Sequence, residues 1–153
     1  MSEKIAVLYV DDEINNLNSF KAVFRRDFNV YTAISGEEGQ KLLRENKIQV
    51  IITDQRMPEM TGVEFLESII PEFPEPMRIL LTGYTDIQAV IDAINKGQIY
   101  YYLNKPWDEQ QLSVVIKNAH EIYRLRSENQ RLLDELERTN RQLEFLIRQK
   151  LLS

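Results

Sequence analysis

Short apolar runs alternate with helical patterns over the first two thirds of this sequence, and this alternation limits the possible folds most. Five runs occur, at Ile5–Val10, Val30–Ile34, Val50–Thr53, Arg78–Thr82 and Ile99–Leu103. The first, third and fourth are nearly continuous in Val, Ile and Leu, as in parallel strands covered on both faces. We therefore expect an α/β domain with a doubly wound parallel sheet and helices on both of its faces.

The segments between the runs carry signals for helix ends. Ser35 stands three residues before Glu38, which is the spacing of a capping box, and Thr85 stands three residues before Gln88. Gly97 follows a helical pattern of apolar residues, so we expect it to cap the end of that helix.

The last segment, from Asp108 to Leu152, contains no Pro and no Gly. It predicts a single helix of roughly 65 Å, at 1.5 Å per residue. Its apolar residues recur at intervals of three and four, which is typical of a heptad seam. With Ile122 at position a, the seam contains Ile122, Leu125, Asn129, Leu132, Leu136, Leu143 and Leu146.

Asn129 at an a position favours a parallel two-stranded coiled coil, whereas Leu133 and Ile147 at e positions leave a higher oligomer open. We expect a globular domain over residues 1–120 and a homodimeric coiled coil over residues 121–153, continuous with the last helix of the domain. The alternative is one amphipathic helix that packs on a partner domain. Because the seam runs to the end of the sequence, we expect either a shortened form of a longer protein or a stand-alone adaptor.

Composition excludes several classes of function. The chain has no cysteine and one histidine, His120, which excludes disulfides and thiolate metal sites and argues against Ser-His-Asp catalysis. Residues 1–107 carry 16 acidic and 11 basic side chains, and residues 108–153 carry eight of each. With no basic patch we expect no direct nucleic-acid binding. With no apolar run of about 18 residues we expect no membrane span and a cytoplasmic location.

Side chains that carry chemistry follow the predicted strands directly. They are Asp11 and Asp12 after the first run, Asp54 after the third, Thr82 at the end of the fourth and Lys105 after the fifth. In a doubly wound sheet these ends meet at one edge. Carboxylates that lie so close repel one another unless a cation joins them, and Mg²⁺ prefers such oxygen ligands. Lys105 adds a positive charge that suits an anion such as phosphate.

These residues form a pattern that resembles a known family. The set Asp11-Asp12, Asp54-x-x-Met57-Pro58-x-Met60-x-Gly62, Thr82-Gly83 and Lys105-Pro106 resembles the receiver domain of two-component response regulators. The resemblance covers about residues 3–120. It implies a flavodoxin-like fold, with a five-stranded parallel sheet in the order 2-1-3-4-5 and the last helix extended into the coiled coil.

The resemblance also implies a chemistry. Asp54 would accept a phosphoryl group from a phosphohistidine of a sensor histidine kinase. Asp12, Asp54 and the main-chain carbonyl of Arg56 would bind Mg²⁺ directly, and Asp11 would hold it through water. The domain would be no classical enzyme, although self-dephosphorylation is expected.

Three further roles follow from the same resemblance. Lys105 would bridge to Asp54 at rest and to the phosphoryl group afterwards, and the Lys105–Pro106 peptide bond would be cis. Thr82 would hydrogen-bond a phosphoryl oxygen, and Tyr102 would turn inward as Thr82 moves. The last helix would then relay the signal through the coiled coil to an unknown output domain that is absent from this chain.

Other interpretations are weaker. A haloacid-dehalogenase-like phosphatase needs a second Asp two residues after the nucleophile, where this sequence has Arg56. His120 lacks the helical-bundle context of a phosphotransfer histidine. A structural dimerisation module with a vestigial receiver stays open as the main alternative. Arg56 beside Tyr84 predicts slow loss of the phosphoryl group.

Aromatic residues lie on and directly after the fifth predicted strand. Strand alternation predicts that Tyr100 and Tyr102 face one side of the sheet and Tyr101 the other. Trp107 follows Lys105-Pro106 and is expected to anchor the start of the last helix.

Overall fold

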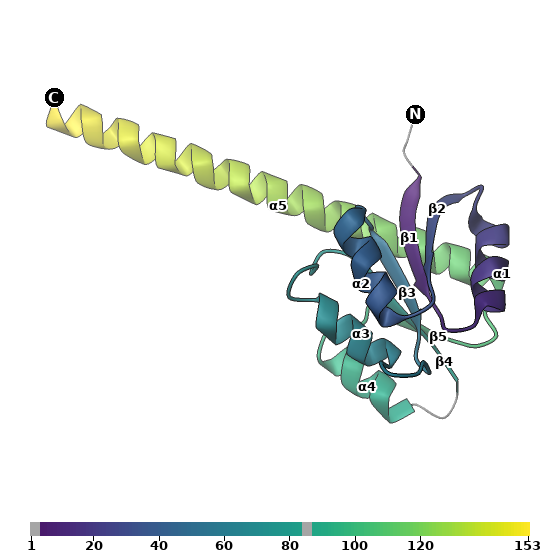
Figure 1. Ribbon diagram of the computed structural model, residues 1–153. Helices are drawn as coiled ribbons and strands as arrows, with labels where there is room; N and C mark the ends of the chain where they lie inside the picture. The colour runs from purple at the N-terminus through teal and green to yellow at the C-terminus, as the bar shows by residue number, and fades with distance from the viewer. Residues whose placement is uncertain (1–3, 84–86) are drawn as a thin grey trace. The chain divides into compact units, whose positions relative to one another are not determined.

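Strands and helices alternate along the chain (Figure 1). The computed structural model describes residues 4–83 and 87–153. In chain order the elements are β1 (Ile5–Val10), α1 (Ile14–Phe24), β2 (Phe28–Ala33), α2 (Gly36–Glu45), β3 (Val50–Asp54), α3 (Gly62–Ile69), β4 (Met77–Thr82), α4 (Ile87–Asn95), β5 (Tyr101–Asn104) and α5 (Glu109–Leu152).

The five strands are parallel and form one sheet in the order β2-β1-β3-β4-β5, which confirms the predicted flavodoxin-like topology. The order reverses between β1 and β3, where Val10 is level with Thr53. In sheets of this kind, ligands bind in the crevice beyond the carboxyl ends of the strands at such a reversal. The topology therefore directs attention to the residues that follow β1 and β3.

The two faces of the sheet bury different side chains. Leu8 and Val10 of β1 belong to a core that includes Phe65 from α3 and Val90 from α4. Tyr9 points to the opposite face, where its ring packs on Phe20 of α1. Figure 1 shows α2, α3 and α4 on one face of the sheet and α1 on the other. Burial on both faces explains why the central strands read as continuous apolar runs.

Three helix ends show how local sequence sets the element limits. The Ser35 hydroxyl accepts a hydrogen bond from the Glu38 amide at 3.1 Å and so caps α2 as predicted. A full capping box that was not among the predicted caps joins Thr61, which directly precedes α3, and Glu64 in the first turn of that helix. Gly97 has a φ of +70°, the left-handed conformation expected after a helix end. The predicted cap at Thr85 lies outside the described residues.

Two strands begin two residues away from the predicted start, and the other strand limits differ by at most one residue. β2 begins at Phe28 rather than Val30, because Phe28 pairs with Ile5 and its ring packs on Phe24. β5 begins at Tyr101 rather than Ile99. The residues before it are held as a loop by the guanidinium group of Arg78, which donates to the carbonyl oxygen of Gln98 at 2.7 Å. Tertiary partners, rather than the apolar runs themselves, set both limits.

The chain divides after His120 into two units. The first contains the sheet, and α5 contributes Leu112, Ile116 and Ala119 to its interior. The second consists of residues 121–153, all within α5 except Ser153. The long last helix predicted from the absence of Pro and Gly is thus confirmed, at 44 residues. Among the described residues, no helix combines the length and apolar character that crossing a membrane requires.

Candidate functional site

Polar side chains gather at the carboxyl edge of the sheet. Asp11 directly follows β1, Asp54 ends β3, Thr82 ends β4 and Lys105 directly follows β5. The first three are almost inaccessible to solvent, with exposed fractions of 0%, 6% and 2%. Because polar groups are rarely buried without a purpose or a partner, this edge is the strongest candidate site in the described part of the chain.

Three carboxylates converge at this edge. One oxygen from each of Asp11, Asp12 and Asp54 can be chosen so that all three lie within 4.8 Å of one another. At such distances the negative charges repel strongly in a poorly solvated site. Carboxylate oxygens are the ligands that Mg²⁺ and Ca²⁺ prefer, so the donor set fits a hard divalent cation. These residues, with carbonyl groups of the following loop, would hold it.

Lys105 supplies positive charge to the cluster. Its ammonium nitrogen lies 3.2 Å from Oδ2 of Asp54 and 3.5 Å from Oδ2 of Asp11. The Lys105–Pro106 peptide bond is cis. Burial alone would lower the pKa of Lys105, but the carboxylates of Asp54 and Asp11 outweigh it and raise the pKa above the ordinary value. Lys105 therefore remains a cation throughout the physiological pH range.

The surroundings of Asp54 disfavour the ionised form of its carboxyl group. Burial raises its pKa above the ordinary value, the charge of Lys105 offsets part of that rise, and the charge of Asp11 adds to it. Without a second cation the ionised carboxylate thus costs the fold free energy. A divalent cation held by Asp11, Asp12 and Asp54 would reduce this cost by neutralising charge.

The loop after β3 is built around the backbone of Asp54. The Gly62 amide donates to the Gln55 carbonyl oxygen at 3.0 Å, and the Val63 amide donates to Oε1 of Gln55 at 2.9 Å. A Cβ atom at Gly62 would collide with the main-chain carbonyl oxygen of Asp54. Only glycine allows this close approach, so the loop fixes the orientation of the Asp54 backbone. The sequence analysis missed Gln55, which has no motif of its own.

Asp11 is held by more partners than the sequence indicated. Oδ2 accepts hydrogen bonds from the hydroxyl of Tyr9 at 2.9 Å and from Nδ2 of Asn16 at 3.1 Å. Oδ1 accepts from the amide of Glu13 at 3.0 Å. The N-cap of α1 is Glu13, so Asp11 does not serve merely as a helix cap. Burial, followed by the charge of Asp11, raises the pKa of Tyr9, which keeps its hydroxyl protonated as a donor.

The position of Tyr9 in the sequence indicates its hydrogen bond to Asp11. A tyrosine inside an otherwise apolar buried strand needs a partner for its hydroxyl group, and the nearest polar residue on the same strand face is two positions away. That residue is Asp11. Asn16 gave no comparable signal.

The predicted switch residues lie beside the cluster. Thr82 is buried, and its hydroxyl group donates to the carbonyl oxygen of Gly83 at 3.1 Å. Tyr102 lies on the edge strand β5, with 43% of its surface exposed. A Cβ atom added at Gly83 would have no other atom within 4 Å, so the backbone there is not crowded. Arg56 lies exposed on the loop after β3, and its predicted neighbour Tyr84 lies outside the described residues.

The rings of Tyr101 and Tyr102 contact each other on β5. Their ring centroids lie 6.3 Å apart and the rings are stacked, with an interplanar angle of 26°. The prediction that Tyr100 and Tyr102 face one side of the sheet and Tyr101 the other stays a prediction. By contrast, Trp107 packs on Phe20 and Phe24 of α1, at 6.1 and 5.7 Å between ring centroids, and anchors the chain just before α5 as expected.

The residues of the predicted dimer seam lie on the second unit. Six of the seven are exposed, and Ile122 is half-buried: Ile122, Leu125, Asn129, Leu132, Leu136, Leu143 and Leu146. A shallow groove at the start of this unit is lined by Ile122, Leu125 and Leu132 together with Asn129. The described chain offers these leucines no tertiary burial.

Fold and site together define an α/β domain with a cluster of three carboxylates and one lysine at the carboxyl edge of a flavodoxin-like sheet. Comparison with known families gives the class: the family "Response regulator receiver domain" matches residues 7–117. The chain therefore belongs to the response regulator receiver family, whose domains are signalling modules.

Individual relatives agree. The chain is 38% identical over 154 residues to the hydrogenase transcriptional regulatory protein HoxA of Cupriavidus necator, which covers all of this chain and 32% of HoxA. It is 35% identical over 130 residues to HoxA of Bradyrhizobium diazoefficiens, covering 85% of this chain and 27% of that protein. The chain thus spans about a quarter to a third of the length of these curated relatives.

Solved structures show the same fold. A response regulator receiver domain from Clostridium thermocellum superposes with a TM-score of 0.75 at 36% identity, covering 79% of this chain and 98% of that one. A structure described as adenylate cyclase from Rhodopirellula baltica superposes with a TM-score of 0.83 at 31% identity, covering 86% of this chain and 98% of that one.

Proposed function

We propose that this chain is a phosphorylatable receiver that accepts a phosphoryl group on Asp54 from a phosphohistidine of a sensor histidine kinase. One observation carries the proposal. Asp54 lies buried at the end of β3, with the carboxylates of Asp11 and Asp12 in reach of a shared cation and the ammonium group of Lys105 at 3.2 Å. A carboxylate with this surrounding is a nucleophile prepared for an anionic, phosphate-bearing partner.

In the proposed reaction, a carboxylate oxygen of Asp54 forms a bond to phosphorus while the P–N bond of the donor's phosphohistidine breaks. The imidazole leaves with the electron pair of that bond, and an acyl phosphate remains. Mg²⁺, held by Asp11, Asp12, Asp54 and the carbonyl group of Arg56, would supply neutralisation of phosphoryl charge. Lys105 would shift from the Asp54 carboxylate to a phosphoryl oxygen, so positioning and charge supply the catalysis.

Thr82 and Tyr102 would change position in response to the phosphoryl group. The Thr82 hydroxyl group would leave the Gly83 carbonyl oxygen and donate to the phosphoryl group. Its movement would free space near β5, into which the exposed ring of Tyr102 could turn. The phosphoryl group would thus favour one of two packings of β5 and its neighbours, since it makes contacts in only one of them.

We further propose that residues 121–153 form a parallel homodimeric coiled coil. The exposed seam leucines need apolar cover, and a second copy of the same stripe provides it in matching register. Paired Asn129 side chains at the a position would fix that register at some cost in stability. Glu121 at g and Arg126 at the following e position of the other copy would have complementary charges. Sedimentation equilibrium of the full chain at tens of micromolar should give a dimer, and a monomer would refute this part.

The output is proposed from the relatives. HoxA proteins are described as transcriptional regulatory proteins, and this chain matches about a third of their length or less. We propose that the coiled coil passes the receiver's state to an output domain that controls transcription. That domain would belong to a longer protein or to a partner, since this chain matches only 32% and 27% of the two HoxA proteins.

Beryllofluoride, which mimics the phosphoryl group of an acyl phosphate, tests the site directly. We expect saturable, Mg²⁺-dependent binding by calorimetry and by Trp107 fluorescence, lost in Asp54→Asn. Asp27→Asn provides the matched control, because Asp27 is exposed at the start of β2, and it should bind like the wild type. Absence of binding to the wild type by both methods would favour the alternative, a structural dimerisation module with a vestigial receiver.

A further inference from the structure

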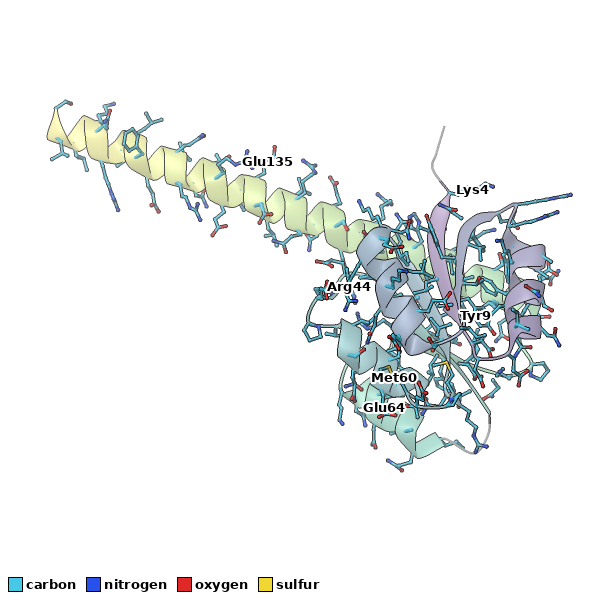
Figure 2. The ribbon with its side chains drawn as sticks, in the orientation of Figure 1. Lys4, Tyr9, Arg44, Met60, Glu64 and Glu135 are labelled. Carbon is cyan, nitrogen blue, oxygen red and sulfur yellow. The ribbon has the colours of Figure 1, made fainter. Side chains whose placement is uncertain are left out.

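A single tyrosine lies between the acidic cluster and the start of α5. Tyr9, labelled in Figure 2, lies fully buried on β1. Its ring packs edge-on against Phe20, with ring centroids 4.5 Å apart. Its hydroxyl group donates to Oδ2 of Asp11 at 2.9 Å. Since β1 is otherwise apolar, this hydroxyl group has a specific task rather than a solvation role.

The ring of Tyr9 makes a second connection. It packs on Phe20 at 4.5 Å between ring centroids, and Phe20 packs on Trp107 at 6.1 Å. Trp107 also packs on Phe24, so its ring is fixed against α1. Tyr9 therefore contacts Asp11 through its hydroxyl group and is linked through the ring of Phe20 to Trp107, the residue two positions before α5.

The remaining partners of Asp11 show why this bond matters. Lys105 also approaches Oδ2 of Asp11, at 3.5 Å, but in the proposed reaction it moves toward the phosphoryl group. The donors that stay are neutral and come from rigid elements: Tyr9 on β1 and Asn16 on α1. Together with the Glu13 amide on Oδ1, they hold the plane of the carboxylate whichever way Lys105 points.

We propose that Tyr9 is a positioning residue that orients the carboxylate of Asp11 for the divalent cation and couples occupancy of that site to Trp107. This rests on the Mg²⁺ site of the proposed function. Donors that hydrogen-bond a metal-binding carboxylate fix its orientation, and their removal typically weakens metal binding by about 10–100-fold. The link reaches Trp107 without passing through Thr82 or Tyr102.

Tyr9→Phe in the full chain tests the idea, because it removes one oxygen and keeps the ring that packs on Phe20. We expect the Mg²⁺ dissociation constant, measured by calorimetry, to rise about tenfold. The change in Trp107 fluorescence on Mg²⁺ binding should fall to less than about half of the wild-type change at saturation. Tyr31→Phe removes a hydroxyl group from the neighbouring strand β2, away from the cluster, and should leave both values unchanged.

A double-mutant cycle separates positioning from general loosening. If Tyr9 acts through Asp11, adding Tyr9→Phe to Asp11→Asn should change the Mg²⁺ dissociation constant less than about twofold. An effect of the same size in both backgrounds would overturn the proposal. If Tyr9→Phe does not fold, Trp107→Ala, read by calorimetry, tests the other end of the link, because it removes the ring that packs on Phe20; we expect a rise of about threefold. Wild-type affinity in that variant would also count against it.

The outcomes distinguish this inference from the proposed function. If the wild type binds no Mg²⁺, the proposed site itself fails. If the wild type binds Mg²⁺ and Tyr9→Phe binds it equally well, the site stands and the role of Tyr9 is refuted.

Discussion

The two units of the chain use the same apolar side chains in opposite ways. In the first unit Leu66 of α3 is completely buried in the core, where residues from most of the strands and helices of that unit meet. In the second unit Leu132 and Leu136 are 49% and 57% exposed. Side chains of the second unit, such as Glu135, extend from a lone helix (Figure 2). One unit finds apolar cover within its own chain, and the other does not.

This difference supports the proposed association of the second unit. Its helix carries exposed ion pairs, such as Glu128 with Arg131 at 2.6 Å, but such pairs contribute little to stability. Most helical stability in proteins comes from packing an apolar face. We therefore expect the first unit to keep its fold by itself and the order of the second unit to depend on the proposed association. The following substitutions test the contrast.

The largest effect is expected in the core. Leu66→Ala leaves a cavity under α3 and should lower the free energy of unfolding by about 2–5 kcal/mol. Urea denaturation followed by Trp107 fluorescence measures it, since Trp107 belongs to the first unit. A loss below about 1 kcal/mol would show that the core is looser than its burial indicates.

The same chemical change in the second unit should act on association instead. Leu132→Ala with Leu136→Ala should leave urea denaturation of the first unit unchanged, but raise the dimer dissociation constant roughly 100-fold, since apolar burial is lost. Sedimentation equilibrium measures the second quantity. Leu151→Ala, a leucine outside the seam, is the control and should dimerise normally. An unchanged dimer in the double variant would place the contact on another face.

Asp54→Asn should stabilise the first unit when Mg²⁺ is absent, by roughly 2–5 °C in melting temperature at pH 7. Burial raises the pKa of Asp54, so the folded state holds this proton more tightly than the unfolded state does. The stability that protonated Asp54 gives is present below the ordinary aspartate pKa of about 3.9 and is lost as pH rises. The difference from wild type should therefore be smallest near pH 4 and widen toward pH 7.

Asp134→Asn is the matched control, because Asp134 is exposed on the second unit and lacks such surroundings. It should leave the melting temperature of the first unit unchanged at every pH. Equal pH profiles for wild type and Asp54→Asn would mean that the acidic cluster costs the fold nothing.

The smallest effect has opposite signs in the two units. Glu59 has a φ of +69°, and the Met60 amide donates to the Pro58 carbonyl oxygen across it. Glu59→Gly should stabilise the first unit by about 0.5 kcal/mol, since relief of the left-handed conformation exceeds the entropy that glycine loses. Glu144→Gly, in the helix interior, should destabilise the second unit by about 1 kcal/mol, read as lost helicity by circular dichroism. The same sign in both would contradict the account.

Much of the first unit could be predicted because its signals are local. Continuous apolar runs such as Ile5–Val10 identify buried parallel strands, and alternation with helices then fixes the layers and brings the strand ends together. The closeness of Asp54 to Lys105 follows from that geometry. The long helix followed equally simply from the absence of Pro and Gly.

The remainder depends on partners far apart in the sequence. The hydrogen bond from Tyr9 to Asp11 could be predicted only from the need of a buried hydroxyl group for a partner. The hydrogen bond from Asn16 to Asp11 depends on the path of α1, which the sequence pattern does not define. Strand alternation alone does not reveal that the rings of Tyr101 and Tyr102 stack. The capping box at Thr61 and Glu64 has the Thr-x-x-Glu spacing and could have been predicted from the sequence.

The proposed function depends on transfer of a phosphoryl group to Asp54 of the first unit. The full chain can be incubated with a phosphorylated sensor kinase or with acetyl phosphate, with and without Mg²⁺, and its intact mass measured. We expect one added phosphoryl group, only with Mg²⁺, absent from Asp54→Asn and present in Asp27→Asn. An unmodified wild-type chain with every donor, or equal modification of Asp54→Asn, would refute the proposal.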